Sequence, residues 1–190
     1  MHHQDYYDQY DRQGVKVYLG EWASRTRTME SALAEALYLC ALERNADVVT
    51  MSSYAPLLCK EGYANWNPNM IYFDNDTITA LTPSYHTQRL WGTYSGNRYV
   101  SSTLELPESL RYRVAASVVT DTRTHKVYLK LVNALPAEVS LSIAGLSIPE
   151  GSKIERISGK VTDQAATIET TTVGGAVQKL PPYSVSVITL

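Results

Sequence analysis

Residues 15–51 read VKVYLGEWASRTRTMESALAEALYLCALERNADVVTM, and this stretch decides how the first half of the chain folds. VKVYL, at 15–19, has the composition of a short strand, and DVVTM begins a second strand over about 47–53. Between them, apolar residues recur at helical spacing over 29–44, with Thr28 at the N-cap and Asn45 as the stop. A strand, a helix and a strand joined by short loops predict a parallel βαβ unit.

The segments of this unit are expected to be covered on more than one face. Apolar residues lie on several sides of the helix, and the second strand is apolar without alternation. One such unit cannot close a sheet, because parallel strands need neighbours on both edges. The unit is therefore expected either to dock on another structure or to be the end of a larger (β/α)8 barrel.

An aromatic segment follows, LLCKEGYANWNPNMIYFDNDT at 57–77, and it is expected to form a long loop. Loops of this length inside a compact domain are usually functional. TPSYHTQRLWGTY, at 82–94, then predicts a helix that begins after Thr82 or Ser84.

From residue 97 onward the sequence changes to short alternating segments separated by turn residues. In HKVYLKLVN, at 125–133, the apolar side chains Val127, Leu129 and Leu131 point one way, and the intervening residues point the other. Several such strands predict an antiparallel β-sandwich. We therefore expect two parts, an α/β part over 1–96 and an all-β part over 97–190.

Composition narrows the classes of function. The chain has 190 residues, of which 44% are hydrophobic and 19% charged, and its net charge is −2 without a basic stripe, which gives nucleic-acid binding little support. No apolar run suggests a membrane span, and the polar start MHHQDYYDQYDRQG has no signal-peptide core. Cys40 and Cys59 make no disulfide framework, and no residue cluster has metal-ligand spacing. The compartment, cytoplasmic or secreted, stays open.

Glu21 is the candidate for chemistry, because it follows directly on the first strand. In (β/α)8 barrels the catalytic residues lie at the carboxyl ends of strands. Gly20 lets the backbone turn, and Trp22 offers a flat aromatic face to a sugar. A retaining glycosidase needs one carboxylate as nucleophile and another, about 5 Å away, as acid and base. From spacing alone, however, a Glu in this place is more often the first polar residue of a loop.

A set of longer strings adds a resemblance. Together they resemble glycoside hydrolase family 51, the α-L-arabinofuranosidases, in order from about Tyr7 to Trp91, and the alternating tail is similar to the C-terminal sandwich of that family. The strings are GEWAS (20–24), ALAEAL (32–37), LERNADVV (42–49), SYAPLL (53–58), WNPNMIYFD (66–74) and TPSY (82–85).

This resemblance implies a fold, an activity and site residues. The family has a (β/α)8 barrel followed by a β-sandwich, needs no cofactor, and releases terminal α-L-arabinofuranosyl residues from arabinan and arabinoxylan with retention of configuration. Its nucleophile ends the seventh strand, which matches Glu21. Many members have Tyr where this chain has Trp22, so the pocket wall is expected to differ there. Asn69 is the nearest match to a sugar-contacting residue, and Trp66 and Tyr54 are expected to line the site.

The resemblance also implies that half of the site is missing from these residues. The acid/base Glu of the family follows the fourth strand, whereas this chain matches from just before the seventh. The chain alone is therefore expected to be inactive, and its expected partners are an arabinose-containing oligosaccharide or polysaccharide and either the N-terminal part of the barrel or further copies of itself.

A second hypothesis is a non-catalytic accessory module, in which the sandwich binds carbohydrate or mediates oligomerisation. A binding sandwich is expected to carry a row of exposed aromatic residues on one sheet face. Residues 97–190 contain only four aromatic residues and no Trp, which favours a structural role for this half: Tyr99, Tyr112, Tyr128 and Tyr183. A truncated gene product without a role of its own is the third possibility.

Other carboxylates are assigned structural roles. Glu35 is expected to pair with a nearby Arg or to reach solvent, and Glu43 and Arg44 to cap or pair at the end of the helix. Glu61, which could replace the missing acid, has no motif around it and is expected to be a solvated loop charge. The Tyr-rich stretch 5–12 is expected to form the loop before the first strand, where it either rims the active site or supports the barrel.

Overall fold

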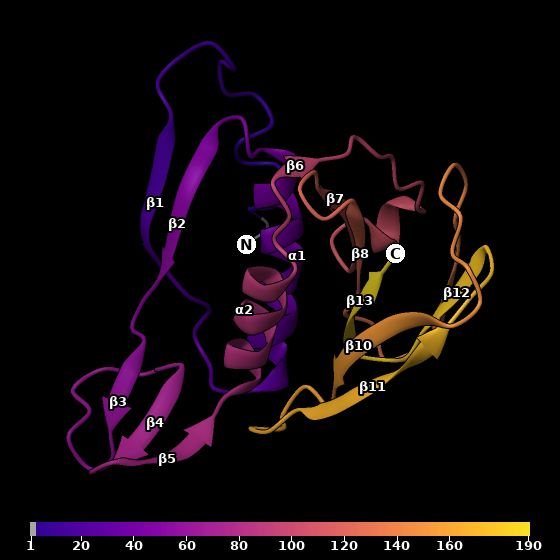
Figure 1. Ribbon diagram of the computed structural model, residues 1–190. Helices are drawn as coiled ribbons and strands as arrows, with labels where there is room; N and C mark the ends of the chain where they lie inside the picture. Colours follow the sequence, from indigo (N-terminus) through magenta and orange to yellow (C-terminus); the bar gives the residue numbers. More distant parts are fainter. Residues whose placement is uncertain (1–2) are drawn as a thin grey trace.

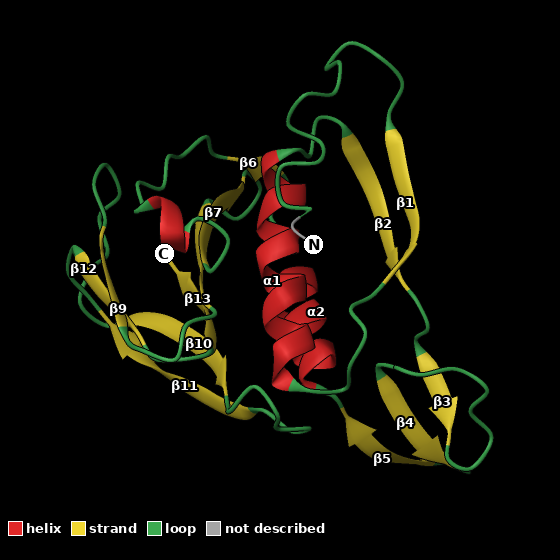
Figure 2. Cartoon of the chain, turned by 180° about the vertical axis from the view of Figure 1, so that it is seen from behind, coloured by secondary structure: helices red, strands yellow, loops and turns green. Residues whose placement is uncertain are grey.

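The computed structural model describes residues 3–190 and has three layers (Figure 1). Helices α1 (Met29–Arg44) and α2 (Pro83–Thr93) lie side by side in the middle. The strands β1 (Val17–Trp22) and β2 (Val49–Tyr54) lie on one side of the helices, and the antiparallel strands of the second half lie on the other (Figure 2). Met1 and His2, with which the polar start begins, lie outside the described residues.

The predicted βαβ unit is confirmed. β1 and β2 pair in parallel, with Val17 opposite Val49 and Trp22 opposite Tyr54. The helix between them ends at Asn45, whose backbone N–H and side-chain amide both donate to the carbonyl of Ala41. Thr28 occupies the N-cap position, but its side chain makes no capping hydrogen bond.

Helix α1 is buried on several faces, as its sequence predicts. One side packs on α2, and another packs on the sheet of the second half. Eleven of its sixteen residues are buried, which explains why apolar residues surround this helix instead of forming one stripe: Met29, Ser31, Ala32, Leu33, Glu35, Ala36, Leu37, Leu39, Cys40, Ala41 and Leu42.

Two expectations for this half are wrong. β2 was expected to be buried on both faces, yet Thr50–Ser52 are exposed, because β2 has β1 as its only neighbour among residues 3–190. The segment 57–77 is also more than a loop. It contributes β3 (Leu58–Lys60) and β4 (Ile71–Asp74) to a small sheet completed by β5 (Thr77–Leu81). The first of these strands is short and pairs across a long connection, so no local pattern indicates it.

The second half forms the predicted antiparallel sandwich. Its six-stranded sheet has the order β11-β10-β13-β8-β7-β6, and the pair β9-β12 covers one face. A short 3-10 helix, η1 (Glu108–Leu110), lies between β6 and β7 in the sequence. The strands are β6 (Arg98–Tyr99), β7 (Val114–Asp121), β8 (Lys126–Asn133), β9 (Val139–Ser142), β10 (Ser152–Ser158), β11 (Thr167–Val173), β12 (Val177–Leu180) and β13 (Ser184–Thr189).

The other face of this sheet is covered by α1, and the alternation predicted for β8 is confirmed, with Leu129 and Leu131 on one face and Tyr128 and Lys130 on the other. Lys130 is fully buried on the face toward α1 and forms an ion pair with Glu43 of that helix. Tyr128 joins the same helix-facing cluster. The second face is buried because a helix far away in the sequence packs on it, and alternation within one strand cannot show this.

The two halves meet near Gly96, which has a φ of +60° and lies directly against the sheet. A Cβ atom there would lie 2.7 Å from the carbonyl oxygen of Thr120, so only glycine fits this crossing. One hydrophobic cluster contains residues from both sides of this point, such as Leu33 and Val185. The boundary between residues 96 and 97 stays a prediction.

Candidate functional site

Glu21 lies at an irregularity of β1. Leu19 pairs with Ser52 and Trp22 with Tyr54, so β1 has one more residue than β2 between these pairs. Such a bulge redirects side chains and is frequent next to active sites. Glu21 is exposed, and its carboxylate has no hydrogen-bond or ion-pair partner among residues 3–190. This arrangement leaves the carboxylate free to meet a ligand at the carboxyl end of a parallel strand.

Trp22 and Tyr54 lie close together behind this position. Their ring centroids are 6.0 Å apart, and Trp22 also meets Tyr38 of α1 at 5.3 Å, both in edge-to-face geometry. The backbone of Ala55 donates a hydrogen bond to the carbonyl of Trp22. The structure therefore brings two of the predicted site residues together, with the indole of Trp22 packed against the helix layer.

Glu35 is a buried carboxyl that sequence reasoning assigned to an ion pair or to solvent, and both expectations are wrong. Its residue is only 2% exposed, and it forms no ion pair within the described part of the chain. Its Oε1 atom accepts hydrogen bonds from the backbone N–H of Ser24, at 3.1 Å, and from the hydroxyl of Tyr54, at 3.4 Å. Burial raises the pKa of Glu35 from an ordinary 4.5 to about 7, although its hydrogen-bond donors act in the opposite direction.

Asn69 and Trp66 form a second group on the small sheet. Asn69 is buried and donates from its side chain to the carbonyl of Trp66 at 2.6 Å, and its backbone N–H donates to the hydroxyl of Tyr72. Trp66 is 68% exposed. Arg27, in the loop after β1, stacks on the ring of Tyr72 at 3.7 Å and so connects this group to the strand that carries Glu21.

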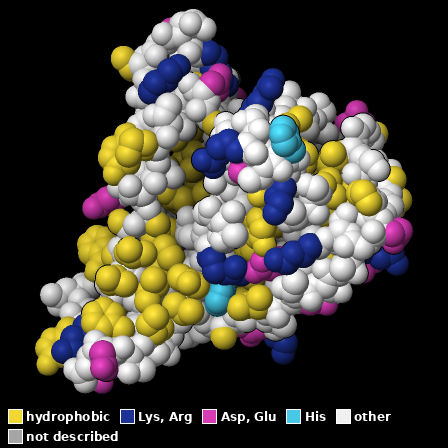
Figure 3. Space-filling model, viewed as in Figure 1, with side chains coloured by type: hydrophobic (Ala, Val, Ile, Leu, Met, Phe, Trp, Pro, Cys, Tyr) yellow, Lys and Arg dark blue, Asp and Glu magenta, His cyan; other side chains and the backbone are white. Residues whose placement is uncertain are grey.

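The surface over β1, β2 and the small sheet is rich in exposed hydrophobic side chains. Figure 3 shows them gathered along the side of the molecule where these strands lie. Among them are Tyr18, Met51, Leu58, Trp66 and Ile78, each more than half exposed. Contiguous apolar surface of this kind marks an interaction site.

The remaining carboxylates have structural surroundings. Glu61 is exposed and accepts a hydrogen bond from Thr79, as expected for a loop charge. Glu43 pairs with Lys130 and also accepts from Ser117, which confirms that this helix end forms ion pairs. Within the part of the chain that the structure describes, no group of three or more His, Cys, Asp or Glu residues could hold a metal ion. No helix in residues 3–190 is long and apolar enough to cross a membrane.

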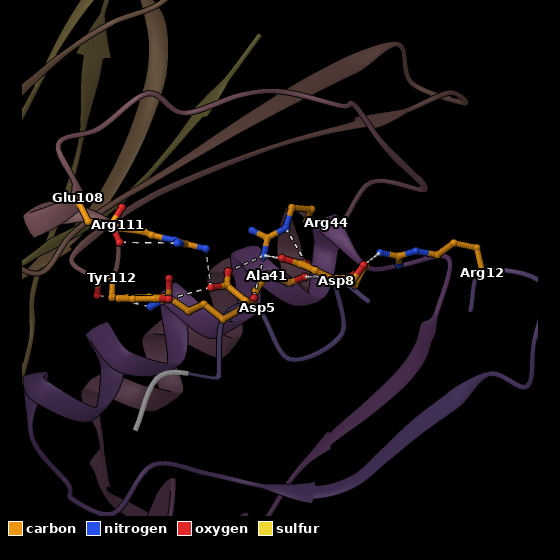
Figure 4. A network of polar contacts seen from close by, with 10 residues as sticks. Asp5, Asp8, Arg12, Ala41, Arg44, Glu108, Arg111 and Tyr112 are labelled. Carbon is orange, nitrogen blue, oxygen red and sulfur yellow. Dashed lines mark hydrogen bonds and ion pairs between the residues drawn. The ribbon is translucent and has the colours of Figure 1, made fainter. Parts of the chain in front are cut away.

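The Tyr-rich start lies at the far end of the βαβ unit from Glu21. Figure 4 shows Asp5 between Arg44 and Arg111, and Asp8 beside Arg44, at the C-terminal end of α1. A βαβ helix runs opposite to its strands, so this end adjoins the amino ends of β1 and β2. Of the two roles considered for this segment, the position favours support of the barrel.

The known sequences to which this chain is similar are those of α-L-arabinofuranosidases. A sequence model of the family described as "Alpha-L-arabinofuranosidase C-terminal domain" matches residues 14–185. The extracellular exo-alpha-L-arabinofuranosidase of Streptomyces chartreusis is 43% identical over 102 residues, which are 54% of this chain and 12% of that protein. The probable alpha-L-arabinofuranosidase A of Aspergillus flavus is 33% identical over 146 residues, which are 73% of this chain and 22% of that protein.

Solved structures give the same result for the fold. The arabinose-bound α-L-arabinofuranosidase MgGH51 has a TM-score of 0.87 and 27% identity, over 98% of this chain and 34% of that one. The α-L-arabinofuranosidase from Thermotoga maritima, in complex with arabinose, has a TM-score of 0.70 and 21% identity, over 98% of this chain and 45% of that one, and shows the fold alone.

These matches confirm the family 51 resemblance and the predicted fold class, the end of a (β/α)8 barrel followed by an antiparallel sandwich. The chain spans less than a quarter of the length of these two curated relatives and less than half of these two solved chains. The roles of Glu21, Trp22, Tyr54, Trp66 and Asn69 stay predictions.

Proposed function

Because this chain belongs to the α-L-arabinofuranosidase C-terminal domain family, we propose that it supplies the nucleophile and one wall of a retaining α-L-arabinofuranosidase site. The observation that carries this proposal is the position of Glu21. An exposed, unpaired carboxylate lies at a bulge, at the carboxyl end of a parallel strand, within the string that resembles the family nucleophile.

The chemistry assigned to Glu21 is attack on the anomeric carbon. The carboxylate oxygen forms a bond to that carbon while the bond to the leaving oxygen breaks, which gives a covalent arabinosyl-enzyme. Water then releases arabinose with retained configuration. A second carboxyl group must protonate the leaving oxygen and later activate the water, from about 5 Å away. We propose that this group comes from the rest of a family barrel.

Four further residues are proposed to hold the sugar and its neighbours. The Trp22 and Tyr54 pair supports the wall behind Glu21, since its rings contact each other and α1. Trp66 offers an exposed face on which a sugar ring can stack, and the buried Asn69 fixes the backbone of Trp66 by its hydrogen bond. The substrate class is a polysaccharide or oligosaccharide with terminal α-L-arabinofuranosyl residues, such as arabinan or arabinoxylan.

The exposed apolar strands β1 and β2 are proposed to be covered in the active protein. Parallel strands are stable only when both faces and both edges are covered. We propose that the covering element is the preceding part of a barrel, with association between copies of the chain as the second route. The 190 residues alone are expected to be inactive, because proton donation by a general acid contributes about 10²–10⁴-fold to rate.

The accessory-module hypothesis receives less support. The central strands β8 and β13 of the six-stranded sheet are covered on both faces, by α1 on one and by β9 and β12 on the other. None of the four Tyr residues after residue 96 is exposed, so no aromatic platform for a sugar is present on this half.

The test joins the chain to the preceding residues of the Streptomyces chartreusis relative and measures release of 4-nitrophenol from 4-nitrophenyl α-L-arabinofuranoside. The joined protein should turn over, the 190-residue chain alone should not, and Glu21→Ala should lose at least about 10³-fold. Azide should restore part of the activity of the variant, since it fills the place of the missing carboxylate. Glu61→Ala is the matched control. Full activity of the Glu21→Ala protein would overturn the proposal.

A further inference from the structure

We propose that Glu35 is a positioning residue that holds the carboxyl ends of β1 and β2 around Glu21. This inference rests on the proposed function and deepens it, since it assigns a supporting role to a residue outside the sugar pocket. Glu35 belongs to α1, and its Oε1 atom lies where the two strands end.

Glu35 contacts the segment that follows β1 and the last residue of β2. The N–H group of Ser24, three residues after Glu21, donates to Oε1 at 3.1 Å. The hydroxyl of Tyr54, the last residue of β2, donates to the same atom at 3.4 Å. Tyr54 is also the strand partner of Trp22 and contacts its ring. One oxygen atom therefore connects the chain just after the nucleophile to the neighbouring strand.

The surroundings of Glu35 make these two contacts dominant. From α2, the side chains of Ser84 and Gln88 face the carboxyl group and favour its charged form. The Oε2 atom, the Ser84 hydroxyl and the Gln88 amide nitrogen are buried without a hydrogen-bond partner among the described residues. An apolar residue would fill this space at lower cost, because a buried carboxyl that lacks an ion pair is expensive. A buried carboxyl with hydrogen bonds to two separate segments is therefore a candidate for a functional role.

The charge of this carboxyl controls the strength of the contact. Hydrogen bonds to an ionised acceptor are roughly twice as strong as those to a neutral one. Burial raises the pKa of Glu35 to about 7, so its proton exchanges near neutral pH. Tyr54 is the titratable group that faces it from β2, and burial raises the pKa of Tyr54 as well, which keeps its hydroxyl proton in place. His86, on α2, is influenced by the charges of Arg89 and Glu155, and Glu35 is not among them.

The test follows Trp22 in the 190-residue chain labelled with 5-fluorotryptophan, by fluorine NMR. The chain has three Trp residues, and Trp22→Phe assigns the resonance. An unperturbed carboxyl titrates below about pH 5, whereas the Trp22 resonance should move with a midpoint near pH 7. Glu35→Gln should abolish this movement. Glu30→Gln, an exposed carboxyl in the first turn of the same helix, should preserve it.

The outcomes separate this inference from the proposed function, because the spectra need no turnover. A static Trp22 resonance in the parent chain, or the same titration in folded Glu35→Gln, overturns the positioning role. If Glu35→Gln does not fold, Tyr54→Phe replaces it. The Tyr54 hydroxyl favours the charged form of the Glu35 carboxyl, so its loss should move the midpoint to higher pH. An unchanged midpoint overturns the inference.

The joined enzyme gives the second readout. Because a small misplacement of a reacting group can cost about 10²-fold, Glu35→Gln should lower kcat by about 10-fold to 100-fold, with KM little changed. In the parent, ionisation of Glu35 should contribute to the acid limb of the pH profile of kcat. This contribution should be absent from Glu35→Gln. Unchanged kcat with an intact profile would contradict the role, whereas loss of all activity in Glu21→Ala tests the nucleophile alone.

Discussion

Strands β2 and β13 are both six residues long and carry similar mixtures of polar and apolar residues, yet their surroundings differ. In β13 five consecutive residues, Ser184–Ile188, are buried, because β8 and β10 flank the strand and both of its faces are covered. In β2 the residues Thr50–Ser52 are exposed, and β1 is its neighbour in the sheet.

The two strands thus differ in how completely the rest of the described chain covers them. The sandwich and helices build a closed core with each other, whereas the strands that carry the candidate site leave apolar surface uncovered. Stability of the 190 residues is therefore expected to reside in the helix and sandwich layers. Variants in the helix and sandwich layers should therefore lower stability more than variants in β2.

Removal of the buried cation between α1 and the sandwich should have the largest effect on the free energy of unfolding. Lys130→Met leaves Glu43 without its ion-pair partner in an apolar interface, and loss of one partner of a buried pair costs about 3–5 kcal/mol. Urea unfolding of the purified chain, followed by circular dichroism, measures the loss. The double variant Lys130→Met/Glu43→Leu should regain most of it. A loss below about 1 kcal/mol would contradict the view that this interface holds the two halves together.

Truncation of matched apolar residues should distinguish the two strands directly. Leu131→Ala, in the sandwich core, should cost about 2–5 kcal/mol, because it creates a cavity. Met51→Ala, at an exposed position of β2, should change stability by about 0.5 kcal/mol or less. An equal loss in Met51→Ala would mean that β2 is covered in solution, and its dependence on protein concentration would then identify association between copies.

Stability should also depend on pH through Glu35. The unfolded chain loses this proton near pH 4.5, whereas the folded chain keeps it to about pH 7. The free energy of unfolding should therefore fall as pH rises through this window and be level above it. At about 1.4 kcal/mol for each pKa unit, the contribution is about 3 kcal/mol. Unfolding of the parent and of Glu35→Gln at several pH values isolates this slope, which should vanish in the variant. Parallel slopes would contradict it.

Much of the fold follows from local patterns. Helical spacing predicts α1, Thr82 predicts the start of α2, and alternation with turn residues predicts the sandwich strands. Local patterns do not show which distant segment covers a face. Lys130 is buried because α1 packs on the second face of the sheet, and its ion-pair partner Glu43 lies 87 residues away in the sequence.

The candidate site could be predicted only in part. A carboxylate after a strand indicates Glu21, but the bulge that redirects it depends on the register with β2. The burial of Glu35 beside the strand ends could not be predicted, because a Glu at the middle of a helix has no distinguishing spacing. Its partners, Ser24 and Tyr54, meet it only once both strand ends lie beside α1.

The smallest losses in the free energy of unfolding are expected at the N-caps of the two central helices. Thr82 accepts a hydrogen bond from the backbone N–H of Tyr85 and donates one to the carbonyl of Met70, so Thr82→Ala should cost about 1–2 kcal/mol. Thr28 makes no capping bond, and its hydroxyl meets only that of Thr26 among the described residues, so Thr28→Ala should cost about 0.5 kcal/mol or less. Urea unfolding of both variants measures the difference. Because Thr82 joins α2 to the small sheet beside the candidate site, a loss for Thr28→Ala that equals or exceeds the loss for Thr82→Ala would shift the critical contact to the start of α1.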